Sequence, residues 1–274
     1  MSHRKGILIW QVDAFADAPF TGNPAAVCVL DEYPSDNWLQ SVASEMNLSE
    51  TAFVVPDAEP ESFRLRWFTP MAEVDLCGHA TLASAHVLLE QQTVSGQRIR
   101  FQTRSGELVC EQRGKQIMLD FPATPIVEGV NRTLADEVRL SLGIESAEVM
   151  RSKFDMVVVV DRPEIVRNLR PDFGRMKLLS TRGVIVTAKS HDEAVDFVSR
   201  FFAPLHQIDE DPVTGSAHCC LAPYWAEKLG KRKLIGYQDS QRGGTVHCEV
   251  DGNRIKLSGT AVTVLQGRLM VDPQ

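Results

Sequence analysis

The 274-residue sequence has no long apolar run and no block of like charge. A membrane-spanning helix needs roughly 20 consecutive apolar residues, and no segment approaches that length. The first apolar run, ILIW, stops at Gln11 and Asp13, which is too short for the core of a signal peptide. The net charge of −7 disfavours nucleic acid or an anionic membrane as partner, but it leaves room for a small anionic ligand. We therefore expect no targeting segment, no nucleic-acid partner and no membrane partner.

The cysteines form no metal-binding or disulfide pattern. No two of them are spaced as C-x-x-C, and their spacing matches no zinc motif. Most lie within apolar segments, which is typical of buried, reduced thiols, so we expect a cytoplasmic protein. The six are Cys28, Cys77, Cys110, Cys219, Cys220 and Cys248.

Short strand-like runs alternate with a few helical ones, which predicts an α+β fold. The content of 43% apolar and 24% charged residues is that of a globular protein, and the length allows one large core or two ordinary ones. The run GHATLASAHVLLEQQ (78–92) is apolar on all sides, which predicts a helix inside a core. A similar run, GSAHCCLAPYWAEKLG (215–230), contains Pro223, which is expected to kink that helix or to end it at Ala222.

The two halves of the chain resemble each other. RWFTP (66–70) matches RFFAP (200–204) at an offset of 134 residues, and CGHAT (77–81) matches PVTGS (212–216) at an offset of 135. The same order of strand, small-residue turn and core helix thus occurs twice, which indicates two similar domains related by a pseudo-twofold axis. The alternative is a chance likeness of two strand-to-helix units.

The segment FPATPIVEG (121–129), with two prolines and a glycine, is the predicted linker between these domains. We therefore expect an N-terminal domain of residues 1–122 and a C-terminal domain of residues 123–261. The last strand, about 262–274, is able to pair back onto the first domain.

Each repeated turn places small residues at the start of a helix, where backbone N–H groups lack partners and the helix dipole is positive. Two such starts, at Gly78 and Gly215, would suit a substrate with a carboxylate. The alternative is that both glycines only cap core helices. Nearby polar residues also have structural alternatives: His79 could bond a carbonyl, and Asp211 and Ser216 could be helix caps.

Five motifs together resemble the PhzF-like family of phenazine biosynthesis, within the superfamily of diaminopimelate epimerase and proline racemase. The resemblance implies two domains, each a β-barrel-like sheet around a central helix, with the active site between them. It also implies a homodimer and no metal or organic cofactor. The motifs are PFTGNPAAV (19–27), NLSETAFV (47–54), LRWFTPMAEVDLCGHATLASAHVL (65–88), DEDPVTGSAHC (209–219) and QRGG (241–244).

The resemblance implies that Glu50 is the catalytic acid/base of a proton-shifting isomerase. A carboxylate among Leu48, Ala52 and Phe53 loses hydration, which suits a group that both takes and gives a proton. Without the resemblance, Glu50 would be interpreted as an exposed strand-edge acid or as a partner of Arg64 or Arg66.

The remaining site residues are also implied by the resemblance. His79 and Asp211 would contact the substrate and assist proton movement, and Ser216 would offer a hydroxyl. Gly78 and Gly215 would offer backbone donors. Asn23 in the GNP turn would bind substrate, although a tight turn alone also explains that motif. The expected substrate is a small carboxylated metabolite, cyclic or unsaturated.

Two other functions remain open at this point. A two-base racemase or epimerase would use Cys77 and a second cysteine, but the offset of 135 places Pro212 at the second position. Cys77 is then interpreted as a small packed residue. The other alternative is a non-catalytic protein that uses this scaffold to bind a ligand or another protein.

Overall fold

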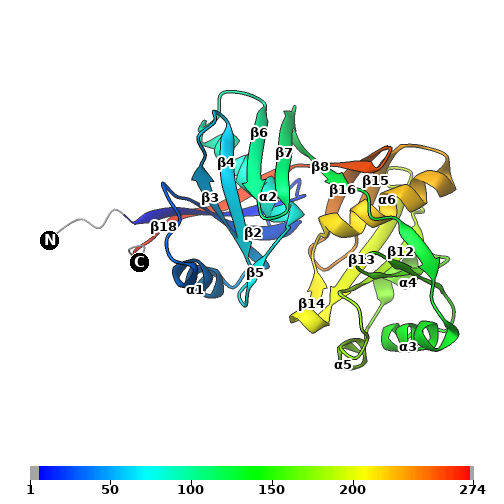
Figure 1. Ribbon diagram of the computed structural model, residues 1–274. Coiled ribbons are helices and arrows are strands. Elements are labelled where there is room, and N and C mark those ends of the chain that lie inside the picture. Colours follow the sequence, from blue (N-terminus) through cyan, green and yellow to red (C-terminus); the bar gives the residue numbers. More distant parts are fainter. Residues whose placement is uncertain (1–5, 272–274) are drawn as a thin grey trace. The chain divides into compact units, whose positions relative to one another are not determined.

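The computed structural model describes residues 6–271, which form two compact units (Figure 1). Unit 1 comprises the residues up to 120 and those from 258 onward, and unit 2 comprises residues 121–257. Both boundaries fall inside strands, and the first, between residues 120 and 121, lies at the start of the segment expected as a linker. Among the helices of residues 6–271, none is long and apolar enough to cross a membrane.

Unit 1 is a strongly curved sheet with two helices. Strand β2 pairs with β1 and, in parallel, with β3, while β4 pairs with β3 and, in parallel, with β6. The elements are β1 (Ile7–Ala14), β2 (Asn23–Val29), α1 (Asp36–Met46), β3 (Glu50–Pro56), β4 (Ser62–Phe68), β5 (Glu73–Val74), α2 (Gly78–Glu90), β6 (Arg98–Thr103), β7 (Gly106–Arg113), β8 (Gln116–Pro122) and β18 (Ala261–Leu269).

Unit 2 follows the same plan with additional short helices. Its elements are β9 (Ile126–Gly129), α3 (Arg132–Leu142), β10 (Glu148–Ser152), β11 (Met156–Val159), α4 (Pro163–Asn168), α5 (Phe173–Met176), β12 (Val184–Lys189), β13 (Phe197–Ala203), the 3₁₀ turn η1 (Pro204–His206), β14 (Ile208–Asp211), α6 (Gly215–Leu229), β15 (Lys233–Gln238), β16 (Gly244–Asp251) and β17 (Arg254–Gly259).

The strand pairings repeat with the same sense in both units. The antiparallel pair β1–β2 corresponds to β10–β11, and the parallel pair β2–β3 corresponds to β11–β12. The antiparallel pair β3–β4 and the parallel pair β4–β6 correspond to β12–β13 and β13–β15. The chain therefore has an α+β fold of two similar barrel-like units, as the sequence predicts.

A largely buried arginine–glutamate pair recurs at the same place in each unit. Arg66 on β4 forms two bonds of 2.7 Å with the carboxylate of Glu73 on β5. Arg200 on β13 forms bonds of 2.7 and 2.8 Å with Glu210 on β14. The offset of 134 residues that relates RWFTP to RFFAP also relates these arginines. Arg66 is thus committed to Glu73 and is not a partner of Glu50.

Each unit packs its sheet around one apolar helix. Helix α2 contacts β1, β2, β3 and β18, and its buried residues lie on all sides of its axis. Helix α6 contacts β15 and β16 in the same way. Such burial requires a helix without a polar face, which is what the two Ala-rich runs supply.

Helix α6 does not end at Ala222, so that alternative of the prediction is wrong, while the predicted kink stays a prediction. It runs from Gly215 to Leu229 with Pro223 in its interior. A proline cannot donate to the carbonyl four residues earlier, here that of Cys219. The backbone N–H of Thr124 donates to this carbonyl at 3.2 Å and so replaces the missing helical bond.

The segment expected as a linker is partly a strand. Its residues Ile126–Gly129 form β9, which pairs antiparallel with β10. The last strand of the chain, β18, pairs antiparallel with β1 from Ile7↔Leu269 to Ala14↔Ala261, and Figure 1 shows it in red beside the blue first strand. Of the strand expected at 262–274, residues 272–274 lie outside the described residues.

Helix α6 carries a buried neutral histidine. The side chain of His218 is fully buried, and its Nδ1–H donates to the carbonyl of Thr214 at 2.9 Å. The ring packs against Phe197 with 5.8 Å between centroids, and a Cβ at Gly236 would lie 2.9 Å from its Cδ2 atom. Burial lowers the pKa of His218 to about 4, because the imidazolium would lose its hydration.

Stability should therefore fall as the pH drops from about 6.5 to about 4. In this window the unfolded chain protonates His218 and the folded chain does not, so the unfolded state binds more protons. The shift corresponds to about 3 kcal/mol in the free energy of unfolding. His218→Phe should remove this loss, so the stability of the variant relative to wild type should rise toward pH 4 in urea titrations. The exposed His206, changed to Gln, is the control, and an equal change in both variants would contradict the assignment.

Candidate active site

Glu50 lies at the seam between α1 and β3. Helix α1 ends at Met46, and Asn47 adopts a left-handed conformation (φ 50°), which asparagine tolerates better than most residues. The chain then turns into β3, whose first residue, Glu50, pairs with Ala25 on the parallel strand β2. The Glu50 side chain is only 13% exposed, so it is not an exposed strand-edge acid.

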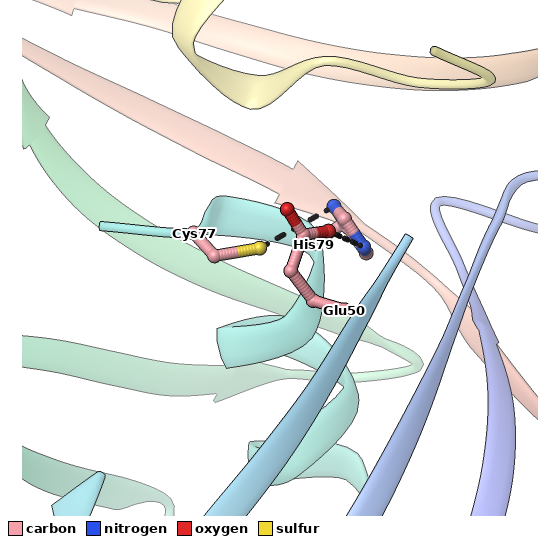
Figure 2. A group of neighbouring side chains, drawn as sticks. All are labelled: Glu50, Cys77 and His79. Carbon is pink, nitrogen blue, oxygen red and sulfur yellow. Dashed lines mark hydrogen bonds and ion pairs between the residues drawn. The ribbon is translucent and has the colours of Figure 1, made fainter. Parts of the chain in front are cut away.

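His79, in the first turn of α2, is the partner of Glu50. Its Nε2 atom lies 3.1 Å from Glu50 Oε2, and its side chain is 7% exposed (Figure 2). This is an ion-pair distance, although its angles fall outside those of a hydrogen bond. Two residues 29 positions apart in the sequence thus form one buried acid–base pair.

The other ring nitrogen of His79 faces Asn23 and Cys77. The distance from His79 Nδ1 to Asn23 Nδ2 is 3.2 Å, and the distance to Cys77 Sγ is 3.6 Å. Asn23 begins β2 and is fully buried. Cys77, expected only to pack, lies within the same cluster, and one ligand atom from each of Glu50, Cys77 and His79 lies within 4.8 Å of the other two.

The electrostatics of this cluster depend on burial and on Glu50. Burial, with the negative charge of Glu50 adding to it, raises the pKa of the Cys77 thiol to about 11, so the thiol is neutral near pH 7. Burial of the His79 ring opposes its charged form, but attraction to the Cys77 sulfur where that is ionised, and to the Glu50 carboxylate, outweighs that penalty and holds the pKa of His79 well above its usual range. With the thiol neutral, Glu50 is the partner that acts on His79.

The predicted residues of unit 2 gather at the start of α6. The Thr214 hydroxyl donates to Asp211 Oδ2 at 2.5 Å. Gln238, which is fully buried, accepts from the Thr214 N–H at 2.8 Å and donates to the Asp211 carbonyl at 2.7 Å. This glutamine fixes the loop before Gly215, the first residue of α6. Nothing in the sequence pattern singles it out.

Ser216 accepts a hydrogen bond from an arginine that the motifs do not include. Arg182 Nη2 donates to Ser216 Oγ at 3.0 Å. The same guanidinium forms bonds of 2.8 and 2.5 Å with Asp155, whose side chain is 2% exposed. Its carbon Cζ lies 5.2 Å from the ring centroid of Phe154. A fixed cation therefore lies beside the hydroxyl of Ser216, which is predicted to contact the substrate.

The starts of α2 and α6 are equivalent positions in the two units. This equivalence corrects the residue of unit 2 predicted to correspond to Cys77. Gly78 and Gly215 each begin a helix, and the caps before them, Cys77 and Thr214, make no side-chain capping bond. Thr214, rather than Pro212, thus occupies the position of Cys77, and Ser216 occupies that of His79. The error arises because Glu210 follows Phe202 by eight positions, whereas Glu73 follows Phe68 by five, so three extra residues precede β14 and α6.

Strand register identifies the counterpart of Glu50. Thr51 pairs with Phe68, and Val184 pairs with Phe202, the residue equivalent to Phe68. Gly183, which precedes Val184, is therefore the counterpart of Glu50. A Cβ at this glycine would lie 2.4 Å from Phe201 Cζ, so the position has no room for a side chain.

The structure thus groups the predicted site residues by unit. In unit 1 it brings together Glu50, His79 and Asn23, with Gly78 adjacent to His79 in the chain. In unit 2 it places Asp211, Gly215 and Ser216 around the start of α6.

Comparisons with known proteins give a consistent result. A profile of the phenazine biosynthesis-like proteins (PhzC-PhzF) matches residues 12–267. An uncharacterized isomerase of Halalkalibacterium halodurans is 49% identical over 265 residues, covering 96% of this chain and 98% of the relative. A PhzF-family protein of Enterococcus faecalis has a crystal structure with a TM-score of 0.89 and 42% identity, covering 96% of this chain and 99% of that one.

A more distant structure shares the fold alone. A hydroxyproline epimerase of Agrobacterium vitis superposes with a TM-score of 0.60 at 11% identity, covering 98% of this chain and 94% of that one. Given the profile match and these relatives, the chain is an isomerase that belongs to the phenazine biosynthesis-like (PhzF) family.

Proposed function

We propose that the protein is a cofactor-independent isomerase that moves a proton within a small carboxylated metabolite, cyclic or unsaturated, with Glu50 as the acid/base. The observation that carries this proposal is the buried contact of 3.1 Å between Glu50 Oε2 and His79 Nε2. A carboxylate held in place by an imidazole and shielded from bulk water is the arrangement expected of a general base.

The proposed reaction needs no oxidant, reductant or co-substrate, because the substrate keeps its electron pair and regains a proton. Glu50 removes a proton from one carbon, leaving the electron pair in the conjugated system of the substrate. Glu50 then returns the proton to another carbon of the same system, and a C–H bond replaces the one that was broken. His79 holds Glu50 in position and stabilises the negative charge of its carboxylate before the first transfer and after the second.

The repeat relation supports one base rather than two. A racemase that inverts a centre needs proton carriers on both faces of a carbon atom. The unit 2 counterparts of Glu50 and Cys77 are Gly183 and Thr214, neither of which is a carboxylate or a thiol. One base on one face gives migration of a proton rather than inversion.

The two helix starts support an anionic substrate. The first-turn N–H groups of α2 and α6 receive no bond from a capping side chain, and helix dipoles place partial positive charge there. The roles proposed for Asn23, Gly78, Asp211, Gly215 and Ser216 follow from this assignment. Arg182 adds a fixed charge beside Ser216.

The deciding experiment compares two variants on a panel of unsaturated carboxylic acids in D₂O, with products followed by NMR. The proposal expects an isomerised product from wild type, its loss in Glu50→Gln, and less than about a tenfold decrease in Cys77→Ala. The opposite result would be activity that is lost in Cys77→Ala and kept in Glu50→Gln, with deuterium entering an amino-acid Cα. It would favour the two-thiol racemase and contradict the proposal.

A further inference from the structure

Three side chains of unit 1 form a ligand set that has the composition of a transition-metal site. Glu50 begins β3, Cys77 caps α2 and His79 lies in its first turn. Figure 2 shows the thiol, the imidazole and the carboxylate pointing toward one another. The three ligand atoms lie within 4.8 Å of one another, and among residues 6–271 no other group of His, Cys, Asp and Glu side chains meets this criterion.

Two of these atoms are buried without a hydrogen-bond partner. Among the described residues, neither Glu50 Oε2 nor His79 Nε2 has one, although they lie 3.1 Å apart. Without a metal, a proton on His79 Nε2 lies between these two atoms and accounts for the ion pair. A metal ion can take the place of that proton.

We propose that Glu50, Cys77 and His79 form a binding site for a soft divalent metal ion of the Zn²⁺ and Cd²⁺ type. Carboxylate oxygen, thiolate sulfur and imidazole nitrogen are all established ligands of such ions, at about 2.0–2.3 Å from Zn²⁺. Ligand atoms around a tetrahedral ion are then roughly 3.5 Å apart, so the cluster needs to contract by about 1 Å. The fourth position is open to water or to another anion.

The surroundings also suit metal binding. With Nε2, which faces Glu50, as the ligand atom, Nδ1 carries the ring hydrogen, and the Asn23 amide 3.2 Å away must turn its oxygen toward Nδ1 to accept it and fix the ring. A thiolate with a single carboxylate is a poor ligand set for Mg²⁺ or Ca²⁺, which require several oxygens. On binding, the Cys77 S–H bond breaks, a sulfur–metal bond forms and the proton leaves to solvent.

Bound metal would inhibit the enzyme. The ion would occupy the carboxylate that the proposed reaction uses, so turnover should fall as metal is added and recover with a chelator. This consequence rests on the proposed function, whereas binding itself does not. Measuring binding directly therefore separates the two ideas.

The test is a titration of the tag-free protein with Cd²⁺ alone, followed by the ultraviolet charge-transfer band of cadmium thiolate and by calorimetry. Wild type should bind one ion per chain and show the band. Cys77→Ala should lose the band, and the matched variant Cys110→Ala, which removes a buried thiol outside the cluster, should keep it. Glu50→Gln should weaken binding at least about tenfold while keeping the thiol. Zn²⁺ should compete with Cd²⁺ for the site.

Three results would overturn the proposal: a band that persists in Cys77→Ala, an unchanged affinity in Glu50→Gln, or no saturation near one ion per chain. Glu50→Gln also tests the site independently of Cys77, which matters if Cys77→Ala does not fold. If the wild-type protein has isomerase activity but binds no metal ion, only this inference is refuted.

Discussion

Glu50→Gln is expected to lower kcat by about 10²–10⁴-fold, the usual contribution of a general acid–base group. Glutamine has the shape of glutamate but cannot accept the proton that the reaction moves. KM should change little, because the helix starts proposed to bind the substrate remain. The measurement is steady-state turnover of the substrate identified in the D₂O panel, with the unfolding midpoint recorded for each protein.

Glu45→Gln is the matched control for this prediction. Glu45 is an exposed residue of α1, five positions before Glu50, and its replacement should change neither rate nor stability. Wild-type turnover in Glu50→Gln would contradict the proposed mechanism. A large loss of stability in that variant would show instead that the carboxylate holds the fold together.

Arg200→Ala should give the largest loss of stability, about 3–5 kcal/mol in the free energy of unfolding of unit 2. The Arg200 side chain is 10% exposed, and its partner Glu210 is 20% exposed. Removal of the arginine leaves the Glu210 carboxylate largely buried and without its cationic partner. It also removes donors at 3.2 and 3.1 Å from the carbonyls of Val166 and Leu169 near the end of α4. Urea unfolding of wild type and variant measures the difference.

The control for Arg200 is an exposed arginine of the same unit. Arg132, whose side chain is 94% exposed, lies 3.8 Å from Asp136, and Arg132→Ala should cost no more than about 1 kcal/mol. Comparable losses in the two variants would contradict the claim that burial, rather than charge pairing in general, gives Arg200 its importance.

The duplication was predictable because the most constrained residues are repeated. RWFTP and RFFAP carry the buried arginines of β4 and β13, and the two Ala-rich runs are the core helices. Details that depend on distant partners were not predictable. The fate of Pro223 depends on an N–H group supplied by Thr124, 99 residues earlier in the sequence.

The site was predictable where a motif is short and continuous. Through their resemblance to the family, the SET and CGH motifs predict Glu50 and His79 as site residues, although their contact of 3.1 Å is a tertiary result that only the fold reveals. Gln238 and Arg182 escaped prediction because each acts through one buried bond network that leaves no local pattern. The counterpart of Cys77 was misplaced because a constant offset cannot account for a loop of different length.

The pairing of β18 with β1 imposes an order on biosynthesis. Unit 1 requires residues from both ends of the polypeptide, whereas unit 2 uses only residues 121–257. During translation, residues up to 120 emerge before β18 has been synthesised, so unit 1 cannot be completed at that stage. Unit 2 can fold as soon as residues 121–257 have emerged, before unit 1 is complete. The order in which the units are completed therefore differs from their order in the sequence. A chain that stops just before β18 would leave Glu50 in a unit whose strand β1 lacks its partner β18.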